Sequence, residues 1–257
     1  MEDEGKFPRI MGFNSTSEAG FNIHAASIFL FGCNFRCPYC MNGRIVVVKE
    51  EDLARPVKSF SLSEIKEKVI AGKHEWVQIS GGEPTLTPLP KLLNLLEEIK
   101  SWGCKIGMST NGTYPHVLEK ILPYLSYVAM DLKSCNLDDF EKLDIVNKKN
   151  SFLMWLNSKR ALFEKKMDDI WKLGRNVGFD YEIRTTVYPK YVSKEGIKNI
   201  GFLIHPDDNW VFQQFRHAKN MLTPEEALNV KPYSEEEFDE IINFAKRYTN
   251  NVHKRYV

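Results

Sequence analysis

The amino-acid sequence predicts an α/β fold, a partial TIM-like barrel of about six strand–helix units. Short apolar runs alternate with longer helical patterns along the chain, which is typical of βαβ units and a parallel sheet. The runs are almost continuously apolar, as expected of parallel strands that are covered on both faces. With 257 residues, of which 43% are hydrophobic, the chain is long enough to bury one large core.

The predicted strands and helices follow one another in regular order. The six apolar runs are Ala25–Phe31, Trp76–Ile79, Cys104–Ser109, Tyr127–Asp131, Tyr181–Val187 and Trp210–Gln214. The predicted helices are Leu62–Ala71, Pro88–Trp102, Tyr114–Leu122, Lys159–Asn176, Lys194–Ile204 and Ser234–Tyr248. Three of them have a serine where a helix N-cap is expected, at Ser61, Ser193 and Ser234. A complete barrel needs eight strands, so this one is expected to be partial.

The chain is expected to form a single domain over residues 1–257, with a core at about 21–215 and a helical extension at about 216–257. One segment, Asn136–Leu156, has no clear assignment. It begins rich in lysine and aspartate and then turns apolar. Two interpretations stay open for it: an elaborated loop that acts as a lid, or an ordinary helix with its connection.

Charge and composition exclude some partners. The formal net charge is +1, from 35 basic and 34 acidic residues, so no basic field for nucleic acid is expected. The longest apolar stretch, Ala25–Phe31, is far shorter than the roughly 20 residues of a membrane-spanning helix. The N-terminus lacks a signal-peptide pattern, so a cytoplasmic location is expected. Three of the five cysteines are crowded together, which favours a metal site over disulfides in that compartment.

The crowded cysteines follow the first predicted strand directly. They are Cys33, Cys37 and Cys40, in the pattern C-x3-C-x2-C. Thiolates suit iron–sulfur clusters or zinc, and a 4Fe–4S cluster normally has four of them. Three thiolates in one loop leave one iron without a protein ligand. A small molecule can then bind the metal directly.

Two other interpretations of this motif are weaker. Structural zinc usually takes two separated pairs of ligands, and the remaining cysteines, Cys104 and Cys135, form no second pair. These two are most simply structural thiols. A thioredoxin-like motif needs only Cys37 and Cys40, so the additional Cys33 makes redox exchange a poorer explanation.

A second motif, Ser80–Pro84, follows the next predicted strand with the sequence SGGEP. Glycines at this point let the backbone approach a ligand closely, and Glu83 supplies a carboxylate suited to an ammonium group. In isolation the motif would be a turn. Because it ends a strand, as the cysteine loop does, it is interpreted as part of a ligand site.

The segments GCNFRCPYC and ISGGEPTL resemble the radical S-adenosylmethionine (SAM) superfamily. The resemblance implies a full or partial βα barrel with one 4Fe–4S cluster on Cys33, Cys37 and Cys40. It also implies that SAM chelates the fourth iron, with Gly81, Gly82 and Glu83 against its amino group.

More residues resemble a narrower group, the activating enzymes of glycyl radical enzymes. The motifs that carry this resemblance are STNG, DLK and YEIRTTVYP, at or near the ends of the next three predicted strands. By this resemblance, the further SAM-contacting residues are Tyr39, Ser109, Thr110, Asn111, Asp131, Lys133 and Arg184. The plainer alternatives are a local ion pair for Asp131 and Lys133, and a barrel-core ion pair for Arg184.

VAMDLK, WVFQQFR and KPYSEEE resemble, within that group, activating proteins of the anaerobic ribonucleoside-triphosphate reductase in their longer form. The resemblance extends from about Met11 to Tyr248. Many such proteins continue the cluster motif as C-H-N, whereas this chain has Met41 after the last cysteine. That departure bears on which partner enzyme the protein would activate, and not on which cofactor it would bind.

The function implied by the resemblance is reductive cleavage of SAM to a 5′-deoxyadenosyl radical, which generates a glycyl radical on a partner enzyme. A flavodoxin or ferredoxin type of reductant would supply the electron. Two alternatives stay open: a radical SAM enzyme acting on a small molecule or peptide in cofactor biosynthesis, and a non-enzymatic zinc-binding module.

Overall fold

The computed structural model describes residues 5–19, 23–46, 58–173, 179–218 and 220–255. The chain forms two compact units, each made of several segments. Unit one comprises Met1–Asn34, Arg44–Ala129 and Leu153–Tyr181. Unit two comprises Phe35–Gly43, Met130–Phe152 and Glu182–Val257. Strands β5 (Tyr127–Asp131) and β6 (Asp180–Val187) each begin in unit one and end in unit two.

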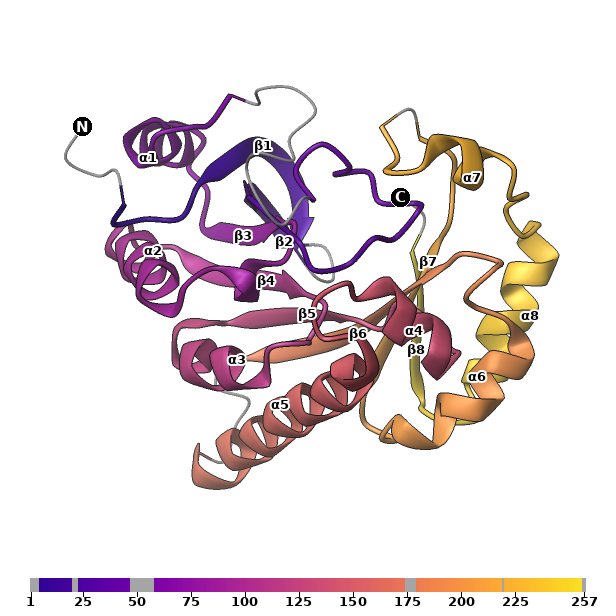
Figure 1. Ribbon diagram of the computed structural model, residues 1–257. Coiled ribbons are helices and arrows are strands. Elements are labelled where there is room, and N and C mark those ends of the chain that lie inside the picture. The colour runs from indigo at the N-terminus through magenta and orange to yellow at the C-terminus, as the bar shows by residue number, and fades with distance from the viewer. Residues whose placement is uncertain (1–4, 20–22, 47–57, 174–178, 219, 256–257) are drawn as a thin grey trace. The chain divides into compact units, whose positions relative to one another are not determined.

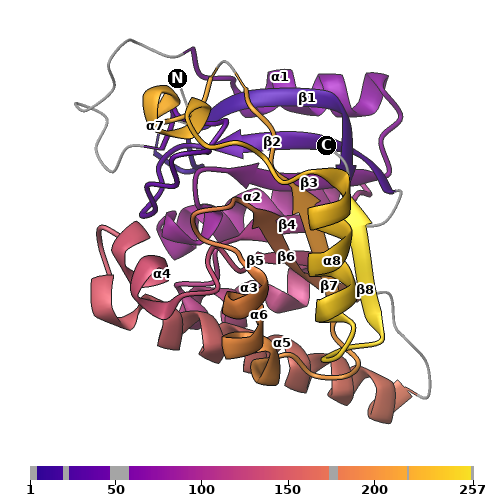
Figure 2. The same cartoon turned by 90° about the vertical axis from the view of Figure 1, so that its right-hand side faces the viewer.

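Unit one contains a sheet with the strand order β1-β2-β3-β4. The strands are β1 (Ile10–Ala19), β2 (Ile23–Leu30), β3 (Trp76–Gly81) and β4 (Lys105–Thr110). Strands β2, β3 and β4 are parallel, whereas β1 pairs antiparallel with β2. Figure 1 and Figure 2 both show these four strands side by side.

Along the chain, the helices of unit one connect one parallel strand to the next, as βα connections require. They are α1 (Leu62–Ala71), α2 (Leu89–Ser101) and α3 (Pro115–Ile121), with most of α5 (Ser151–Leu173). Short 3-10 turns occur at Pro84–Leu86 and Leu122–Tyr124. Helix α1 begins at a capping box, in which Ser61 and Glu64 each bond the other's backbone N–H. The expected end of α5 at Asn176 lies outside the described residues, and this helix begins at Ser151 rather than Lys159.

One face of the sheet of unit one is apolar, and the opposite face includes several polar residues. Ile28, Ile79 and Met108 lie in register on the apolar face, and all three are fully buried. The next register row on the opposite face contains Gln78 and Gly107. Strands β3 and β4 are buried on both faces, as expected, but their polarity alternates where continuous apolarity was expected.

Unit two contains the parallel strands β6, β7 (Asn209–Gln214) and β8 (Asn251–Arg255). Its helices are α4 (Leu137–Leu143), α6 (Lys194–Ile200), α7 (Pro224–Leu228) and α8 (Glu235–Ala245). It also has 3-10 turns at Lys148–Asn150 and Gly201–Leu203. Helix α8 begins at a second capping box, built by Ser234 and Glu237, and packs beside β8 (Figure 2).

Strands β1 and β8 were not expected from the sequence. The residues after 216 therefore form α7, α8 and a strand, where an all-helical extension was expected. The uncertain segment 136–156 forms α4, a 3-10 turn and the start of α5, which agrees with the simpler interpretation of a helix and connection. That the chain is one domain stays a prediction.

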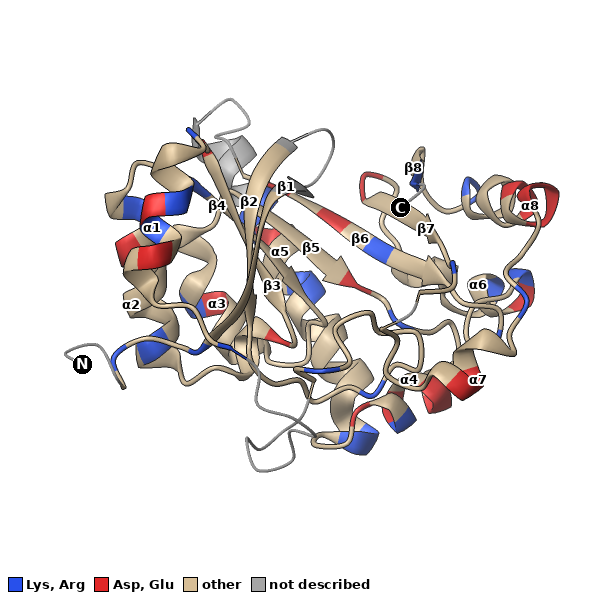
Figure 3. Cartoon of the chain, turned by 90° about the horizontal axis from the view of Figure 1, so that it is seen from above, with Lys and Arg blue, Asp and Glu red and all other residues tan. Residues whose placement is uncertain are grey.

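Charges of both signs are spread over the helices. Figure 3 shows basic and acidic bands together on α1 and an acidic start on α8. Across the described residues, no helix has the length and apolar character needed to cross a membrane.

Candidate functional site

The SGGEP turn in unit one is bonded to the backbone just before Cys33. The Gly82 N–H donates to the Leu30 carbonyl over 3.0 Å, and the Glu83 N–H donates to the Gly32 carbonyl over 2.7 Å. Gly81 has φ +118°, and a Cβ there would lie 2.2 Å from the Leu30 nitrogen. A Cβ on Gly82 would lie 1.7 Å from the Gly32 oxygen. Both positions therefore require glycine, because the turn lies directly against the chain leading into Cys33.

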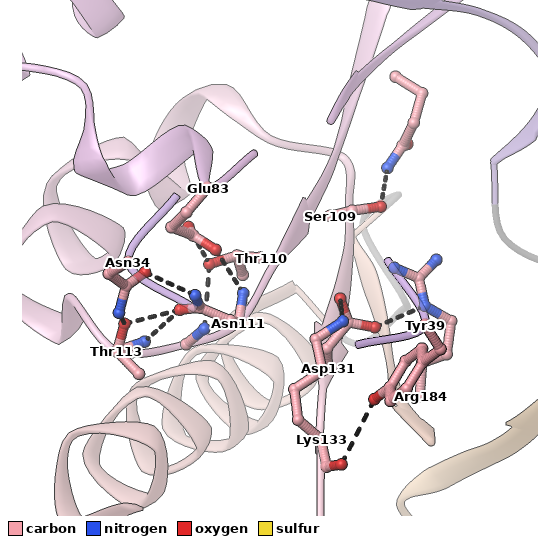
Figure 4. A network of polar contacts seen from close by, with 12 residues as sticks. Asn34, Tyr39, Glu83, Ser109, Thr110, Asn111, Thr113, Asp131, Lys133 and Arg184 are labelled. Carbon is pink, nitrogen blue, oxygen red and sulfur yellow. Dashed lines mark hydrogen bonds and ion pairs between the residues drawn. The ribbon is translucent and has the colours of Figure 1, made fainter. Parts of the chain in front are cut away.

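Glu83 lies in the interior of unit one and is 1% exposed. Its carboxylate accepts hydrogen bonds from the N–H and the hydroxyl of Thr85. It also accepts from the Thr110 hydroxyl over 2.6 Å and from the Asn111 N–H over 2.6 Å. Burial raises the pKa of Glu83, and these donors oppose that rise because they favour the anion. Glu83 therefore joins the turn to the end of strand β4, as Figure 4 shows.

Three buried side chains form a closed ring beside Glu83 (Figure 4). Asn111 donates from Nδ2 to Oδ1 of Asn34 over 2.8 Å, and Asn34 donates from Nδ2 to the Thr113 hydroxyl over 3.0 Å. The Thr113 hydroxyl donates to Oδ1 of Asn111 over 2.6 Å. Asn34 directly follows Cys33, so the ring ties the cysteine loop to the TNG turn.

Ser109 lies on the same face of the sheet as Gln78 and takes no part in the hydrogen bonds to Glu83. Its hydroxyl accepts a hydrogen bond from Nε2 of Gln78 over 3.0 Å. Oε1 of Gln78 is buried and, within the described parts of the chain, has no hydrogen-bond partner. Gly107 leaves room for this amide, since a Cβ there would lie 2.0 Å from Oε1. An unsatisfied acceptor on a polar face fits a ligand that donates a hydrogen bond.

The expected polar residues of unit two form an ion triad. Asp131 contacts Nζ of Lys133 at 2.8 Å and Nε of Arg184 at 2.7 Å (Figure 4). Burial alone would raise the pKa of Asp131, but the two cations outweigh it and hold this pKa at about 2. Burial tends to lower the pKa of Lys133. The nearby Asp131 carboxylate more than offsets this effect, so the pKa of Lys133 is raised. The triad therefore carries one net positive charge at neutral pH.

Tyr39 packs in an aromatic cluster of unit two. Its ring centroid lies 4.9 Å from that of Tyr188 and 6.3 Å from that of Phe215. Its hydroxyl donates to the Lys133 carbonyl over 3.5 Å, which joins the cysteine loop to the triad. Tyr188 is fully buried, and its hydroxyl has no hydrogen-bond partner among the residues described.

The Cys37–Cys40 part of the loop is held by backbone bonds within unit two. The Cys40 N–H donates to the Cys37 carbonyl over 3.0 Å, and the Leu222 N–H donates to the Cys40 carbonyl over 2.9 Å. Burial raises the pKa of Cys37 to about 12, although Lys133 opposes the rise. Burial also raises the pKa of Cys40. Without a cation these groups are thiols, and a metal would displace their protons on binding.

The donor set fits a 4Fe–4S cluster. All five cysteines are free thiols. Over the described residues, no three His, Cys, Asp or Glu side chains converge on a point where one metal ion could bind. A multi-iron cluster does not require such convergence, because each cysteine binds a different iron. The sequence did not single out Asn34, Thr113 or Gln78; only the position of Asn34 beside Cys33 could have drawn attention to it.

The fold and these strand-end motifs are those of the radical SAM class. The model of the Radical SAM superfamily matches residues 27–185, and the chain belongs to this superfamily. Its fold resembles coproporphyrinogen III oxidase of Escherichia coli, a radical SAM enzyme, with a TM-score of 0.53 at 14% identity. That match covers 86% of this chain and 51% of the other. The expected fold class is thereby confirmed, and the family's cofactors are a 4Fe–4S cluster and SAM.

Two relatives indicate which kinds of radical SAM protein this chain is similar to. A Methanocaldococcus jannaschii protein, provisionally named a glycyl-radical enzyme activating enzyme, is 30% identical over 230 residues, covering 89% of this chain and 87% of its own. The 7-carboxy-7-deazaguanine synthase of Haemophilus influenzae is 34% identical over 141 residues, covering 54% of this chain and 59% of its own. The expected resemblance to activating enzymes is confirmed. Because the chain belongs to the Radical SAM superfamily, the alternative of a non-enzymatic zinc-binding module is set aside.

Proposed function

We propose that this radical SAM enzyme generates a glycyl radical on a partner enzyme. The observation that carries the proposal is the similarity to the M. jannaschii relative over nearly the whole of both chains. A match of that extent includes the regions beyond the shared superfamily segment, where substrate is expected to be selected. In addition, only Cys104 and Cys135 remain outside the motif, too few to ligate an auxiliary cluster.

Cys33, Cys37 and Cys40 would hold the cluster, as their sequence spacing indicates. The backbone of Gly81 and Gly82 would approach SAM, together with Tyr39 and the polar residues Ser109, Thr110, Asn111, Asp131, Lys133 and Arg184. Bound together, the two cofactors supply a carbon-centred radical that can remove a hydrogen atom from a Cα–H bond.

The residues of this chain would orient and insulate that chemistry. The net positive charge of the Asp131–Lys133–Arg184 triad favours an anionic group, such as thiolates or the carboxylate of SAM. Asp131 remains ionised at neutral pH because its pKa is about 2, so both cations keep their positions. Cys37 and the Tyr39 ring are shielded from water by burial, whereas Cys40 is partly exposed.

The partner that the sequence motifs favour is an anaerobic ribonucleoside-triphosphate reductase. A flavodoxin or ferredoxin type of protein would reduce the cluster. An oxygen-sensitive cluster and five free thiols also favour a reducing compartment, and we infer the cytoplasm.

A second candidate function is the modification of a small molecule in cofactor biosynthesis. The similarity to 7-carboxy-7-deazaguanine synthase supports it. That similarity covers only 54% of this chain, so it is less informative about substrate than the longer match.

Electron paramagnetic resonance distinguishes the two candidates. The anaerobically reconstituted protein is mixed with reductant, SAM and a candidate glycyl radical enzyme, and a matched partner with its radical glycine changed to alanine serves as control. A doublet that requires the glycine supports the activase proposal. If candidate partners give no doublet while a small molecule greatly stimulates consumption of SAM, the second function replaces the first.

A further inference from the structure

The backbone on both sides of Cys33 is anchored within unit one. Before it, the Gly32 carbonyl accepts the 2.7 Å hydrogen bond from the Glu83 N–H. After it, both ends of the Asn34 amide are occupied, by Asn111 at 2.8 Å and Thr113 at 3.0 Å. Asn34 and Thr113 are fully buried. Such a buried ring, with each amide and hydroxyl bonded, holds its members in one arrangement.

The Glu83 carboxylate is held by donors within the same unit. Oε1 accepts three hydrogen bonds, two from Thr85 and one from Thr110, and Oε2 accepts one from Asn111. Glu83 is 1% exposed. An external ammonium group would find room only at Oε2, on a side chain that is almost wholly buried. The four internal bonds thus account for the burial of Glu83 without a contact to SAM.

We infer that Asn34, Thr113 and Glu83 are positioning residues, which place the Cys33 thiol through the hydrogen-bonded ring and the SGGEP turn. The inference rests on the proposed function, in which Cys33 binds the cluster. Residues that orient a metal ligand typically change metal affinity by about 10–100-fold when they are removed. Glu83 would thus act on the cluster and not on the SAM amino group.

Thr113 offers a matched pair of variants. Thr113→Val keeps the shape of the side chain and removes the hydroxyl, whereas Thr113→Ser keeps the hydroxyl. Thr249→Val is a control in unit two, because the buried Thr249 hydroxyl bonds the carbonyls of Pro206 and Asp208 at 2.8 and 2.7 Å. The readout is the rate of iron release to a chelator from anaerobically loaded protein without SAM.

We expect Thr113→Val and Asn34→Ala each to speed iron release by about tenfold or more. Thr113→Ser and Thr249→Val should stay within about twofold of the unaltered protein, since the ring is intact in both. The double variant Asn34→Ala/Thr113→Val should be little worse than the more severe single variant, because the two residues act as one unit. Release from Thr113→Val as slow as from Thr113→Ser would overturn the inference.

Glu83→Gln tests the role of the carboxylate directly. The inference predicts faster iron release, by about tenfold, with a SAM dissociation constant on the loaded fraction within about threefold of the unaltered protein. If Glu83 bound the ammonium, the variant would keep its iron and lose about tenfold or more in SAM affinity. That second pattern would overturn this inference alone. An unaltered protein that takes up no cluster would overturn the proposed function and this inference with it.

Discussion

At the scale of single residues, buried charge is the feature with the clearest energetic consequence. Asp131 is paired with both Lys133 and Arg184, and its side chain is 11% exposed. Removing the shared anion would leave two partly buried cations without their partner. A buried pair broken on one side typically costs about 3–5 kcal/mol.

We therefore predict that Asp131→Asn lowers the free energy of unfolding by about 3 kcal/mol in urea at pH 7. Asp139→Asn is the control, since Asp139 pairs with a Lys142 side chain that is 75% exposed. It should cost at most about 1 kcal/mol. An equal loss in both variants would show that the triad does not contribute as a buried network.

The lowered pKa of Asp131 also predicts how the free energy of unfolding depends on pH. The carboxyl group's folded-state pKa of about 2 lies below its ordinary value of 3.8, so its contribution is fully present above pH 4 and is lost as pH falls toward 2. The difference in unfolding free energy between the unaltered protein and Asp131→Asn should thus be constant from about pH 7 to 5 and shrink below about pH 4. A difference that disappears already between pH 7 and 5 would assign the effect to another group.

At the scale of elements, the close approach of the SGGEP turn to the cysteine loop sets a requirement for glycine. Gly82→Ala would place a Cβ 1.7 Å from the Gly32 oxygen, so we predict that it displaces the loop and lowers iron content after reconstitution by at least about half. Gly103→Ala is the control, because Gly103 has φ +81° but no atom within 4 Å of the added Cβ. It should cost about 1 kcal/mol of stability and retain full iron content.

Strand β8 is held by an ion pair that its own sequence does not reveal. Arg255 contacts Glu182 through two nitrogens, each at 3.0 Å, and Glu182 is fully buried. Arg255→Ala would leave that carboxylate unpaired, and we predict a loss of about 3 kcal/mol in urea unfolding. Lys194→Ala, which removes an exposed pair with Glu240, should cost at most about 1 kcal/mol. Similar losses from both would contradict the role given to β8.

At the scale of the whole molecule, the βα order, the helix caps and the strand-end motifs could be predicted from the sequence. Each depends on local pattern: apolar runs, Ser61 and Ser234 at helix starts, and polar residues where strands end. Strands β1 and β8 could not, because IMGFNSTSEA turns polar after Phe13 and NVHKR is mostly polar, so neither contains a long apolar run. The Asn34–Asn111–Thr113 ring was also missed, since contacts between residues 77 or 79 positions apart leave no trace in spacing.

The central claim is that the three clustered cysteines bind a 4Fe–4S cluster that cleaves SAM reductively. The most direct measurement is 5′-deoxyadenosine formed with dithionite and SAM by anaerobically reconstituted protein, compared with Cys37→Ala and with Cys104→Ala as a cysteine control. The account predicts product from the unaltered protein and Cys104→Ala, and none above background from Cys37→Ala. A folded protein that binds no cluster, or product formation that survives Cys37→Ala, would contradict it.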